Sequence, residues 1–365
     1  MADVIIIGAG LAGLTAADIL ARSGRSVTVV EARPFVGGRT MTMRPEELGD
    51  RAWLDMGATW HWEDQERVRA LAADLGVAAF PQWRNGAAVT EDAPGATPSL
   101  VELPPPSPAE LRFVGGPQPL CERLAARVEA NGGEVLLSTT VVSVEDEPGY
   151  GHVVVSVVDP DDAGIDLHAE HVIVAAPPLL VLENIPFTPD LPAELEEVMR
   201  LTPTWMATAL KCVAVYETPF WRADGLSGLA FSEVGPLREV HDACTDDASV
   251  AALWGFISPR HEFRDLSFDD RIEQVFAQLG RLFGPAAADP VRYYERDWSN
   301  DPFTNDEVHY TGRPPVDYGH PAFLAPLWDG RLHWSGTETA QSEGSGHMEG
   351  AIESGQRAAR AVLDA

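Results

Sequence analysis

The sequence predicts an α/β fold in which a larger domain with a parallel sheet is interleaved with a smaller α+β domain. Three observations lead to this prediction. An apolar β run at the N-terminus is followed at once by a glycine-rich turn and an Ala/Leu-rich helix. A strand, a glycine turn and the start of a helix recur near the C-terminus, around Leu332 and Met348. A buried strand at residues 172–178 returns the chain to the first domain, so three distant segments contribute to it.

The N-terminal element has the pattern Gly-Ala-Gly-Leu-Ala-Gly at residues 8–13, between the strand Val4–Ile7 and a helix. The next strand, Val27–Val30, ends in Glu31. This is the dinucleotide-binding fingerprint in its required context, because the turn lets the backbone approach a pyrophosphate and the acid can bind the adenosine ribose. An ordinary glycine turn is the alternative, and the strand, helix and acid at the right spacing argue against it. The pattern therefore predicts a Rossmann-like domain.

A second glycine-rich element, Glu31-Ala-Arg-Pro-Phe-Val-Gly-Gly-Arg39, follows directly. Its two adjacent glycines allow another close approach to the backbone, and Arg33 and Arg39 supply positive charge for phosphates. Nicotinamide enzymes do not need this second element. It therefore favours FAD as the cofactor of the predicted domain.

The remaining patterns divide the chain. Residues 85–108 are rich in Pro, Gly, Ser and acid, which is typical of a loop or linker. A helix is expected at residues 67–76, and another from Ser267, its N-cap, to Phe283. We expect residues 1–80, 114–200 and 299–365 to form the FAD-binding domain, and residues 81–113 and 201–298 to form the substrate domain.

Lys211 lies in the otherwise apolar strand Thr208–Tyr216 and is the only lysine in the chain. Burying an ammonium group is costly and lowers its pKa, so a lysine retained at such a position is a candidate for function. The alternative is a lysine at a strand end whose stem lies on apolar surface. We favour the functional interpretation.

Composition excludes several classes of protein. The net charge of −30 argues against nucleic acid and anionic membranes as partners. A solvated acidic surface explains this charge better than steering of a cationic substrate. Three scattered cysteines predict neither a disulfide framework nor a metal site, and they fit a reducing cytoplasm. No apolar run reaches membrane-spanning length, so we expect no membrane anchor.

Taken together, these motifs resemble the flavin-dependent monoamine and polyamine oxidases over most of the chain. The resemblance includes Met56–Trp60, Lys211 with Pro219-Phe-Trp221, and Asp297-Trp298, in family order. Its most specific elements are Gly-Thr-Glu-Thr-Ala at 336–340 and Met-Glu-Gly-Ala at 348–351. The dinucleotide fingerprint is far less specific to this family.

Residue by residue, the resemblance implies two kinds of site. Lys211 would hold a water at the flavin N5, and His347 stands where the family usually has an aromatic residue of the substrate cage. Cofactor contacts are implied for Gly8, Ala9, Gly10, Leu11, Ala12, Gly13, Glu31, Ala32, Arg33, Gly38, Arg39, Gly57, Ala58, Thr59, Val141, Trp298, Gly336, Glu338 and Met348.

Three departures from the family pattern also carry expectations. No cysteine follows Trp298, where covalent members attach their flavin, so FAD is expected to be non-covalent. The family's large helical insertion in the substrate domain is missing. The pocket is therefore expected to be open, or completed by a partner, for example in a homodimer. His347 and the opposite wall near His309 and Tyr310 indicate an altered aromatic cage.

The implied reaction is oxidation of a small-molecule amine. An unprotonated amine would lose hydride from its α-carbon to the flavin N5, the imine would hydrolyse, and O2 would be reduced to H2O2. Oxidation of an amino acid or of a biosynthetic intermediate is one alternative. A non-catalytic, flavin-bearing redox or interaction protein is another, although the retention of Lys211 and Trp298 favours an enzyme.

Overall fold

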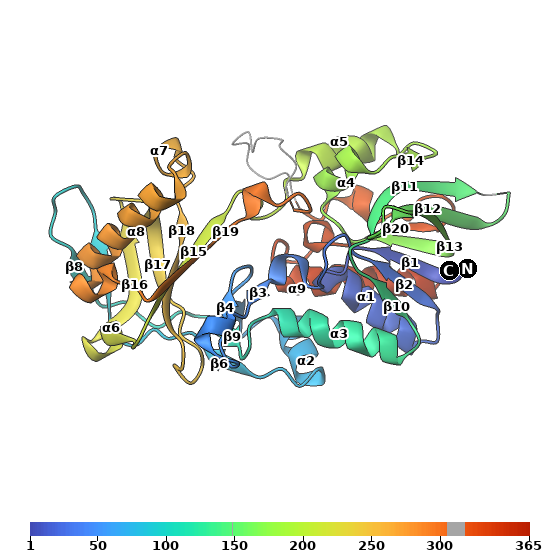
Figure 1. The fold of residues 1–365 in the computed structure, drawn as a ribbon. Helices are drawn as coiled ribbons and strands as arrows, with labels where there is room; N and C mark the ends of the chain where they lie inside the picture. The colour runs from blue at the N-terminus through green and yellow to red at the C-terminus, as the bar shows by residue number, and fades with distance from the viewer. Residues whose placement is uncertain (148, 305–317) are drawn as a thin grey trace.

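The computed structural model describes residues 1–147, 149–304 and 318–365, which form two lobes, each built on one sheet (Figure 1). In the described part of the chain, the larger sheet has the order β10-β2-β1-β13-β12-β11-β14, with β20 paired to β13. Its strands are β1 (Ala2–Ile7), β2 (Val27–Val30), β10 (Glu134–Leu136), β11 (Thr140–Glu147), β12 (His152–Val158), β13 (Gly164–Val174), β14 (Phe187–Thr188) and β20 (Leu332–Trp334).

Parallel pairing joins distant parts of the chain in this sheet. β1 pairs in parallel with both β2 and β13, and β13 pairs in parallel with β20. The central strands are buried on both faces and read as continuous apolar runs, as Val4–Ile7 does. N-terminal, middle and C-terminal segments thus meet at the carboxyl ends of adjacent strands. The larger domain is of the predicted Rossmann type, whereas its exact boundaries stay a prediction.

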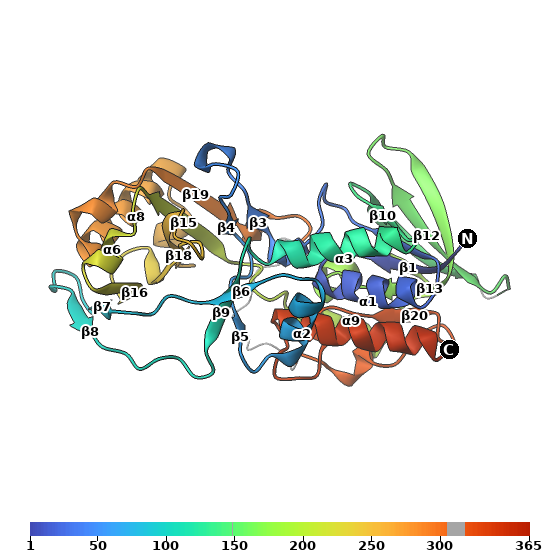
Figure 2. The same ribbon diagram turned by 90° about the horizontal axis from the view of Figure 1, so that it is seen from below.

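Helices cover both faces of the larger sheet. On one face α1, α3 and α9 run side by side, with α2 next to α9 (Figure 2). An added Cβ at Gly355 of α9 would lie 2.4 Å from the Ala12 carbonyl oxygen, so glycine permits the close crossing of α1 and α9. The helices are α1 (Leu11–Arg22), α2 (Glu66–Asp74), α3 (Gln118–Ala130) and α9 (Met348–Leu363) on this face, and α4 (Pro178–Asn184) and α5 (Ala193–Leu201) on the other.

The second lobe is built on a sheet of order β19-β15-β18-β17-β16-β7-β8. The long helix α8 covers its outer face (Figure 1). The strands are β7 (Ala87–Glu91), β8 (Ser99–Val101), β15 (Leu210–Tyr216), β16 (Leu226–Ser232), β17 (Leu237–Asp242), β18 (Ala251–Ile257) and β19 (Arg292–Asp297), and the helices are α6 (Phe220–Ala223), α7 (His261–Arg264) and α8 (Phe268–Phe283).

The period-two alternation of β15 decides where Lys211 points. Leu210, Cys212 and Ala214 pack in the core beneath α8. Val213 and Val215 pack on the opposite face, in a cluster that includes Met56 of the first lobe. Because successive side chains of a strand point to opposite faces, Lys211 shares the inner face with these valines.

Short elements connect the lobes. β3 (Thr42–Met43) pairs with β4 (Leu54–Asp55), and β5 (His61–Trp62) and β6 (Ala79–Pro81) both pair with β9 (Glu110–Phe113). Single 3-10 turns lie at Gly38–Thr40, Glu46–Leu48, Pro285–Ala288, Trp298–Asn300, Pro321–Phe323 and Thr337–Thr339.

The expectation that residues 85–108 form a loop or linker was wrong for two short stretches. This segment contains β7 and β8, and β7 pairs in parallel with β16 of the second sheet. Ala87, Ala88 and Val89 are buried, but the run is short and lies between glycine- and proline-rich stretches that obscure it in the sequence. The helix predicted from Ser267 to Phe283 was confirmed, and the Ser267 hydroxyl accepts a hydrogen bond from the Asp270 N–H.

Candidate active site

A cavity of about 640 Å³ lies between the two sheets. Its wall runs from the turn after β1, past the start of α9, to the inner face of the second sheet. Most of the residues predicted to form the site line it, whereas Ala9, Gly13 and Glu338 lie behind the wall. The lining includes Gly8, Gly10, Leu11, Ala12, Glu31, Ala32, Arg33, Gly38, Arg39, Gly57, Ala58, Thr59, Val141, Lys211, Trp298, Gly336, His347 and Met348.

One end of the cavity is a backbone cradle. Gly8 has a φ of +106°, and a Cβ added at Gly13 would lie 2.0 Å from the Gly8 carbonyl oxygen, so both positions require glycine. A Cβ at Gly10 would meet nothing within 4 Å, which leaves open space at the start of α1. The Glu31 carboxylate accepts hydrogen bonds from the backbone N–H groups of Ala9 (2.8 Å) and Arg33 (2.9 Å). This arrangement fits a nucleotide at the N-terminus of a helix.

The two arginines of the second glycine element already have carboxylate partners. Arg33 is buried, donates to Thr304 Oγ1 at 2.8 Å, and forms an ion pair with Asp301. Arg39 binds both carboxylate oxygens of Glu338, which also accepts a hydrogen bond from the Trp205 N–H at 3.1 Å. Their charges are therefore largely compensated within the protein.

The buried Glu338 is ionised because of these donors. Burial by itself would raise its pKa, but Arg39 and the Trp205 N–H outweigh burial and hold the pKa below its usual value. Glu338 thus acts behind the cavity wall, where it fixes the Arg39 side chain that lines the cavity.

The wall at the middle of the cavity is formed by the closely packed backbone at Gly57 and by the indole of Trp298. A Cβ added at Gly57 would lie 2.1 Å from the Arg39 carbonyl oxygen. Trp298 is buried and donates its Nε1–H to the Met56 carbonyl oxygen at 3.0 Å. The indole also contacts Arg296, whose guanidinium carbon lies 4.9 Å from the Trp298 ring centroid. These contacts hold Trp298 in one orientation at the wall.

Lys211 reaches the wall beside this segment. Its side chain is 1% exposed, and its Nζ donates to Thr59 Oγ1 at 2.5 Å and to the Gly57 carbonyl oxygen at 3.1 Å. The same nitrogen lies 4.1 Å from the centroid of the Trp254 ring. Burial lowers the pKa of Lys211 to about 7, so the amine can change protonation state near neutral pH.

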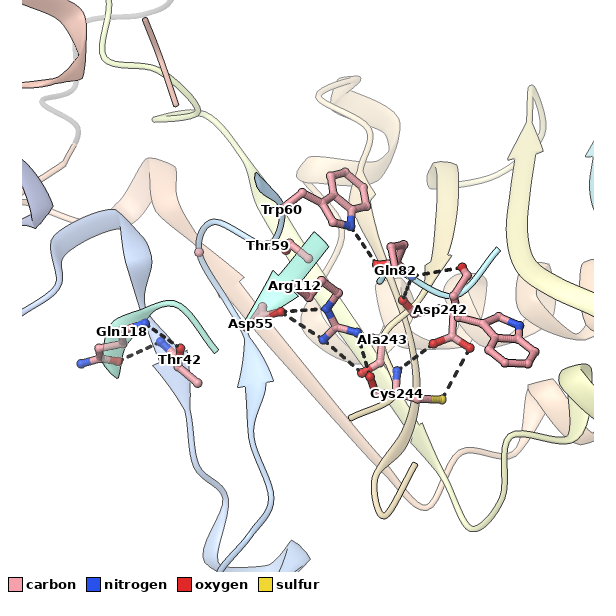
Figure 3. Close-up of polar contacts among 12 residues, drawn as sticks. Thr42, Asp55, Thr59, Trp60, Gln82, Arg112, Gln118, Asp242, Ala243 and Cys244 are labelled. Carbon is pink, nitrogen blue, oxygen red and sulfur yellow. Dashed lines mark hydrogen bonds and ion pairs between the residues drawn. The ribbon is translucent and has the colours of Figure 1, made fainter. Parts of the chain in front are cut away.

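The end of the cavity on the second sheet has an aromatic wall made by Trp60, Trp254 and Phe256. Ring centroids are 5.1 Å apart for Trp60 and Trp254 and 5.0 Å apart for Trp254 and Phe256. The Trp60 Nε1–H donates to Gln82 Oε1 at 2.8 Å, which orients that indole (Figure 3). This end can therefore enclose an apolar group between ring faces and edges.

His347 lies at the N-cap of α9, between Trp62 (ring centroids 5.3 Å apart) and Trp205 (6.2 Å). Its Nδ1 is buried without a hydrogen-bond partner among the described residues. Burial lowers the pKa of His347, and this effect exceeds the opposite one of the nearby Ser345 backbone. A neutral imidazole therefore faces the cavity near neutral pH.

Sequence reasoning missed Trp205, Trp254 and Phe256, although Trp254 and Phe256 are two residues apart on a strand and so share a face. Apolar residues on a strand usually indicate core, and nothing in the sequence shows that this face borders a cavity. The predicted wall near His309 and Tyr310 lies outside the described residues.

Other chemistries find little support in the described residues. The three cysteines are buried and free, none lines the cavity, and burial raises the pKa of each to about 12. Within residues 1–147, 149–304 and 318–365, no group of His, Cys, Asp and Glu could hold a metal ion. No helix in these ranges is long and apolar enough to cross a bilayer.

Comparison with known proteins agrees with this geometry. The family of flavin containing amine oxidoreductases matches residues 11–109 and 107–363. The flavin-containing amine oxidase B of Cavia porcellus is 27% identical, and the match covers 100% of this chain and 86% of the relative. That alignment spans 467 positions against 365 residues here, so the relative carries segments without a counterpart in this chain.

Solved structures are similar over the whole chain. Wild-type putrescine oxidase bound to putrescine is 25% identical, with a TM-score of 0.82 and coverage of 100% of this chain and 99% of that one. Cyclohexylamine oxidase from Brevibacterium oxydans has the same fold, with a TM-score of 0.84 at 22% identity and the same coverage. With the glycine cradle, the buried Glu31 beside it and the aromatic cavity in place, the chain belongs to the flavin-containing amine oxidoreductases and is an FAD-dependent enzyme that oxidises amines.

Proposed function

We propose that this enzyme oxidises apolar monoamines, with arylalkyl amines as the preferred class. The observation that carries this proposal is the aromatic end of the cavity, where Trp60, Trp254 and Phe256 are joined by Trp62 and Trp205. Such a wall gains free energy by burying apolar surface, and it offers ring faces to an aromatic substituent.

The charges of the cavity support a monoamine over a diamine or an amino acid. Among the described lining residues, the only carboxylate is Glu31, which lies at the nucleotide end. The second ammonium of a diamine would therefore be buried without an anionic partner, which is costly. A substrate carboxylate would have to compete with Asp301 for Arg33 and with Glu338 for Arg39.

FAD, when bound, supplies the hydride-accepting chemistry that amino-acid side chains lack. The cradle at residues 8–13 and Glu31 would hold its adenosine and pyrophosphate. Trp298 and the segment Gly57–Thr59 would hold its ring system, and the N-terminus of α9 at Met348 would favour negative charge there. Most residues in these assignments line the cavity. Glu338 and Gly13 do not, and they would act indirectly, Glu338 by holding Arg39 and Gly13 by allowing α1 to pack closely.

Two side chains of the wall, His347 and Lys211, are titratable groups whose pKa values are lowered by burial. His347, as a neutral imidazole, would accept a hydrogen bond from the substrate amine and take up its proton, so that the amine reacts unprotonated. Lys211 would bind a water or donate a proton on the other side of the cavity, from its position on Thr59 and Gly57.

Three further assignments extend the proposal. O2 would be the electron acceptor and would leave as H2O2. A second copy of the chain would complete the open pocket. The cytoplasmic location stays a prediction from the sequence, based on the free cysteines.

Anaerobic bleaching of the flavin absorbance tests the substrate class. Benzylamine and phenylethylamine should reduce the flavin at least ~100-fold faster than putrescine or an amino acid, because only they avoid burying an unpaired charge. Faster reduction by putrescine or by an amino acid would refute the proposal and favour the corresponding alternative substrate.

A matched pair of variants tests the aromatic wall itself. Phe256→Ala should raise the KM for phenylethylamine roughly tenfold, because about 1–2 kcal/mol of apolar contact is lost. Phe276→Ala provides the control, since Phe276 packs against Tyr293 on the opposite side of the sheet. Equal effects of the two substitutions would show that the wall does not contact substrate.

A further inference from the structure

An ion pair lies buried behind the cavity wall, outside the set of residues assigned above. Arg112 of β9 donates to Asp55 Oδ2 of β4 from Nη2 (3.1 Å) and Nε (3.3 Å). Its Nη1 donates to the Cys244 carbonyl oxygen at 2.8 Å (Figure 3). The guanidinium thus joins the first lobe to the second sheet.

The arginine has little freedom to move. Its side chain is 2% exposed, and its guanidinium carbon lies 5.0 Å from the Trp53 ring centroid and 5.3 Å from the Phe80 ring centroid. Asp55 is also buried, and a Cβ added at Gly116 would lie 2.9 Å from Asp55 Oδ1. That second carboxylate oxygen is buried and has no hydrogen-bond partner among the described residues.

Lys211 donates to the segment that carries Asp55, but it has no ion-pair partner of its own in the described part of the chain. Its nitrogen contacts two neutral oxygens, from Gly57 and Thr59, and the Trp254 ring. Gly57 follows Asp55 by two residues, so the acceptor of the lysine and the carboxylate belong to one short segment. A buried amine without a direct counter-ion responds to the nearest charges through space.

We propose that Asp55 and Arg112 are positioning residues of the active site, whose buried ion pair sets the charge on the Lys211 side chain at the cavity wall. Asp55 attracts a proton to Lys211, and Arg112 opposes this attraction both directly and by neutralising Asp55. The pair replaces a salt bridge to the lysine, which would hold the ammonium permanently charged.

The other groups next to Lys211 on β15, β18 and β19 are uncharged, paired with a carboxylate or directed to the opposite face. On β19, Arg296 is the strand partner of Lys211, but its guanidinium is partly exposed and pairs with Asp301, which it shares with Arg33. On β18, the strand partner is the uncharged Phe256. The neighbouring Cys212 points to the opposite face, and burial raises the pKa of its thiol to about 12. Burial is also the main reason that the pKa of Lys211 is low, with Asp55 raising it and Arg112 lowering it further.

The chain offers a direct measurement, because Lys211 is its only lysine. In FAD-loaded enzyme grown on lysine labelled with 13C at Cε, one side-chain signal reports the titration of Lys211 by NMR. The wild-type midpoint should lie near pH 7. Asp55→Asn should lower it and Arg112→Met should raise it, each by about one pH unit, as expected for loss of a nearby charge.

Controls separate charge from structure. Phe80→Leu weakens the packing on the Arg112 guanidinium without changing any charge, so it should leave the Lys211 midpoint within about 0.3 units of the wild type. Removing one member of a buried pair can prevent folding, so the double variant Asp55→Asn/Arg112→Met removes both charges together. Its midpoint should lie between those expected for the two single variants.

Two results would overturn the proposal. One is a wild-type midpoint near 10, the ordinary value for lysine. The other is a midpoint that does not fall in Asp55→Asn, or a double-variant midpoint that lies no higher than that of Asp55→Asn. The proposal rests on the proposed function only in one respect, namely that the charge on Lys211 affects the rate of amine oxidation. Because the NMR signal does not depend on turnover, an enzyme that oxidises no arylalkyl amine would leave this result intact.

Discussion

His61 should make the folded protein sensitive to mild acid. It lies in β5 with 1% of its side chain exposed and stacks on Phe113, with ring centroids 4.2 Å apart and an interplanar angle of 9°. Neither ring nitrogen has a hydrogen-bond partner among the described residues. Burial, with a smaller contribution from Arg69, lowers the pKa of His61 from 6.5 to about 4.

The sign and size of the effect follow from proton linkage. Between pH 6.5 and pH 4 the unfolded chain binds a proton at His61 and the folded chain does not, so the free energy of unfolding falls as the pH decreases through this window. With these two pKa values, the loss is about 2 kcal/mol at pH 5 and approaches 3 kcal/mol near pH 4. At pH 7.5 both states are neutral and the contribution vanishes.

Urea unfolding of the wild type and of His61→Phe measures this contribution. Phenylalanine keeps a ring against Phe113 but cannot bind a proton. Between pH 7.5 and pH 5, the wild type should lose about 2 kcal/mol more than the variant. Unfolding should be followed by both tryptophan fluorescence and flavin release, since a free energy can be read only where the two transitions coincide. Equal losses in the two proteins would refute the reasoning.

Three further substitutions test single contacts. Gly57→Ala should lower the ratio of flavin to protein absorbance after purification, because its Cβ would lie 2.1 Å from a carbonyl oxygen, whereas Gly164→Ala, in open space, should leave the ratio unchanged. Glu338→Gln should lower the thermal midpoint by several degrees, because Arg39 loses its buried counter-charge; an unchanged midpoint would contradict this. Ser267→Ala should cost about 1 kcal/mol of unfolding free energy through loss of the α8 cap, and a urea midpoint equal to that of the wild type would rule the cap out.

The nucleotide-binding part of the site could be predicted because its constraints are local. Gly8, Gly13 and Glu31 serve a turn, a helix contact and a strand end within one continuous segment, so their spacing in the sequence carries the geometry. Lys211 could be singled out for a different reason. A charged residue in an apolar strand conflicts with its surroundings, and such conflicts mark candidate functional positions.

The second half of the cavity could not be predicted in the same way. Trp254 and Phe256 look like core residues of a strand, and the sequence does not show that their face borders the cavity. The strand β7 was missed because its partner β16 lies more than a hundred residues away. Pairing between distant strands, and not local propensity, makes such a short run a strand.

The sequence by itself determined the α/β class, the nucleotide cradle and the unusual lysine, because strand period, turn glycines and the cost of a buried charge act over a few residues. Only the tertiary structure decided what surrounds that lysine. Asp55, Arg112 and Lys211 come from three separate strands, β4, β9 and β15. Their interaction depends on distance in a buried, weakly screened environment, and that distance exists only once the two lobes have packed against each other.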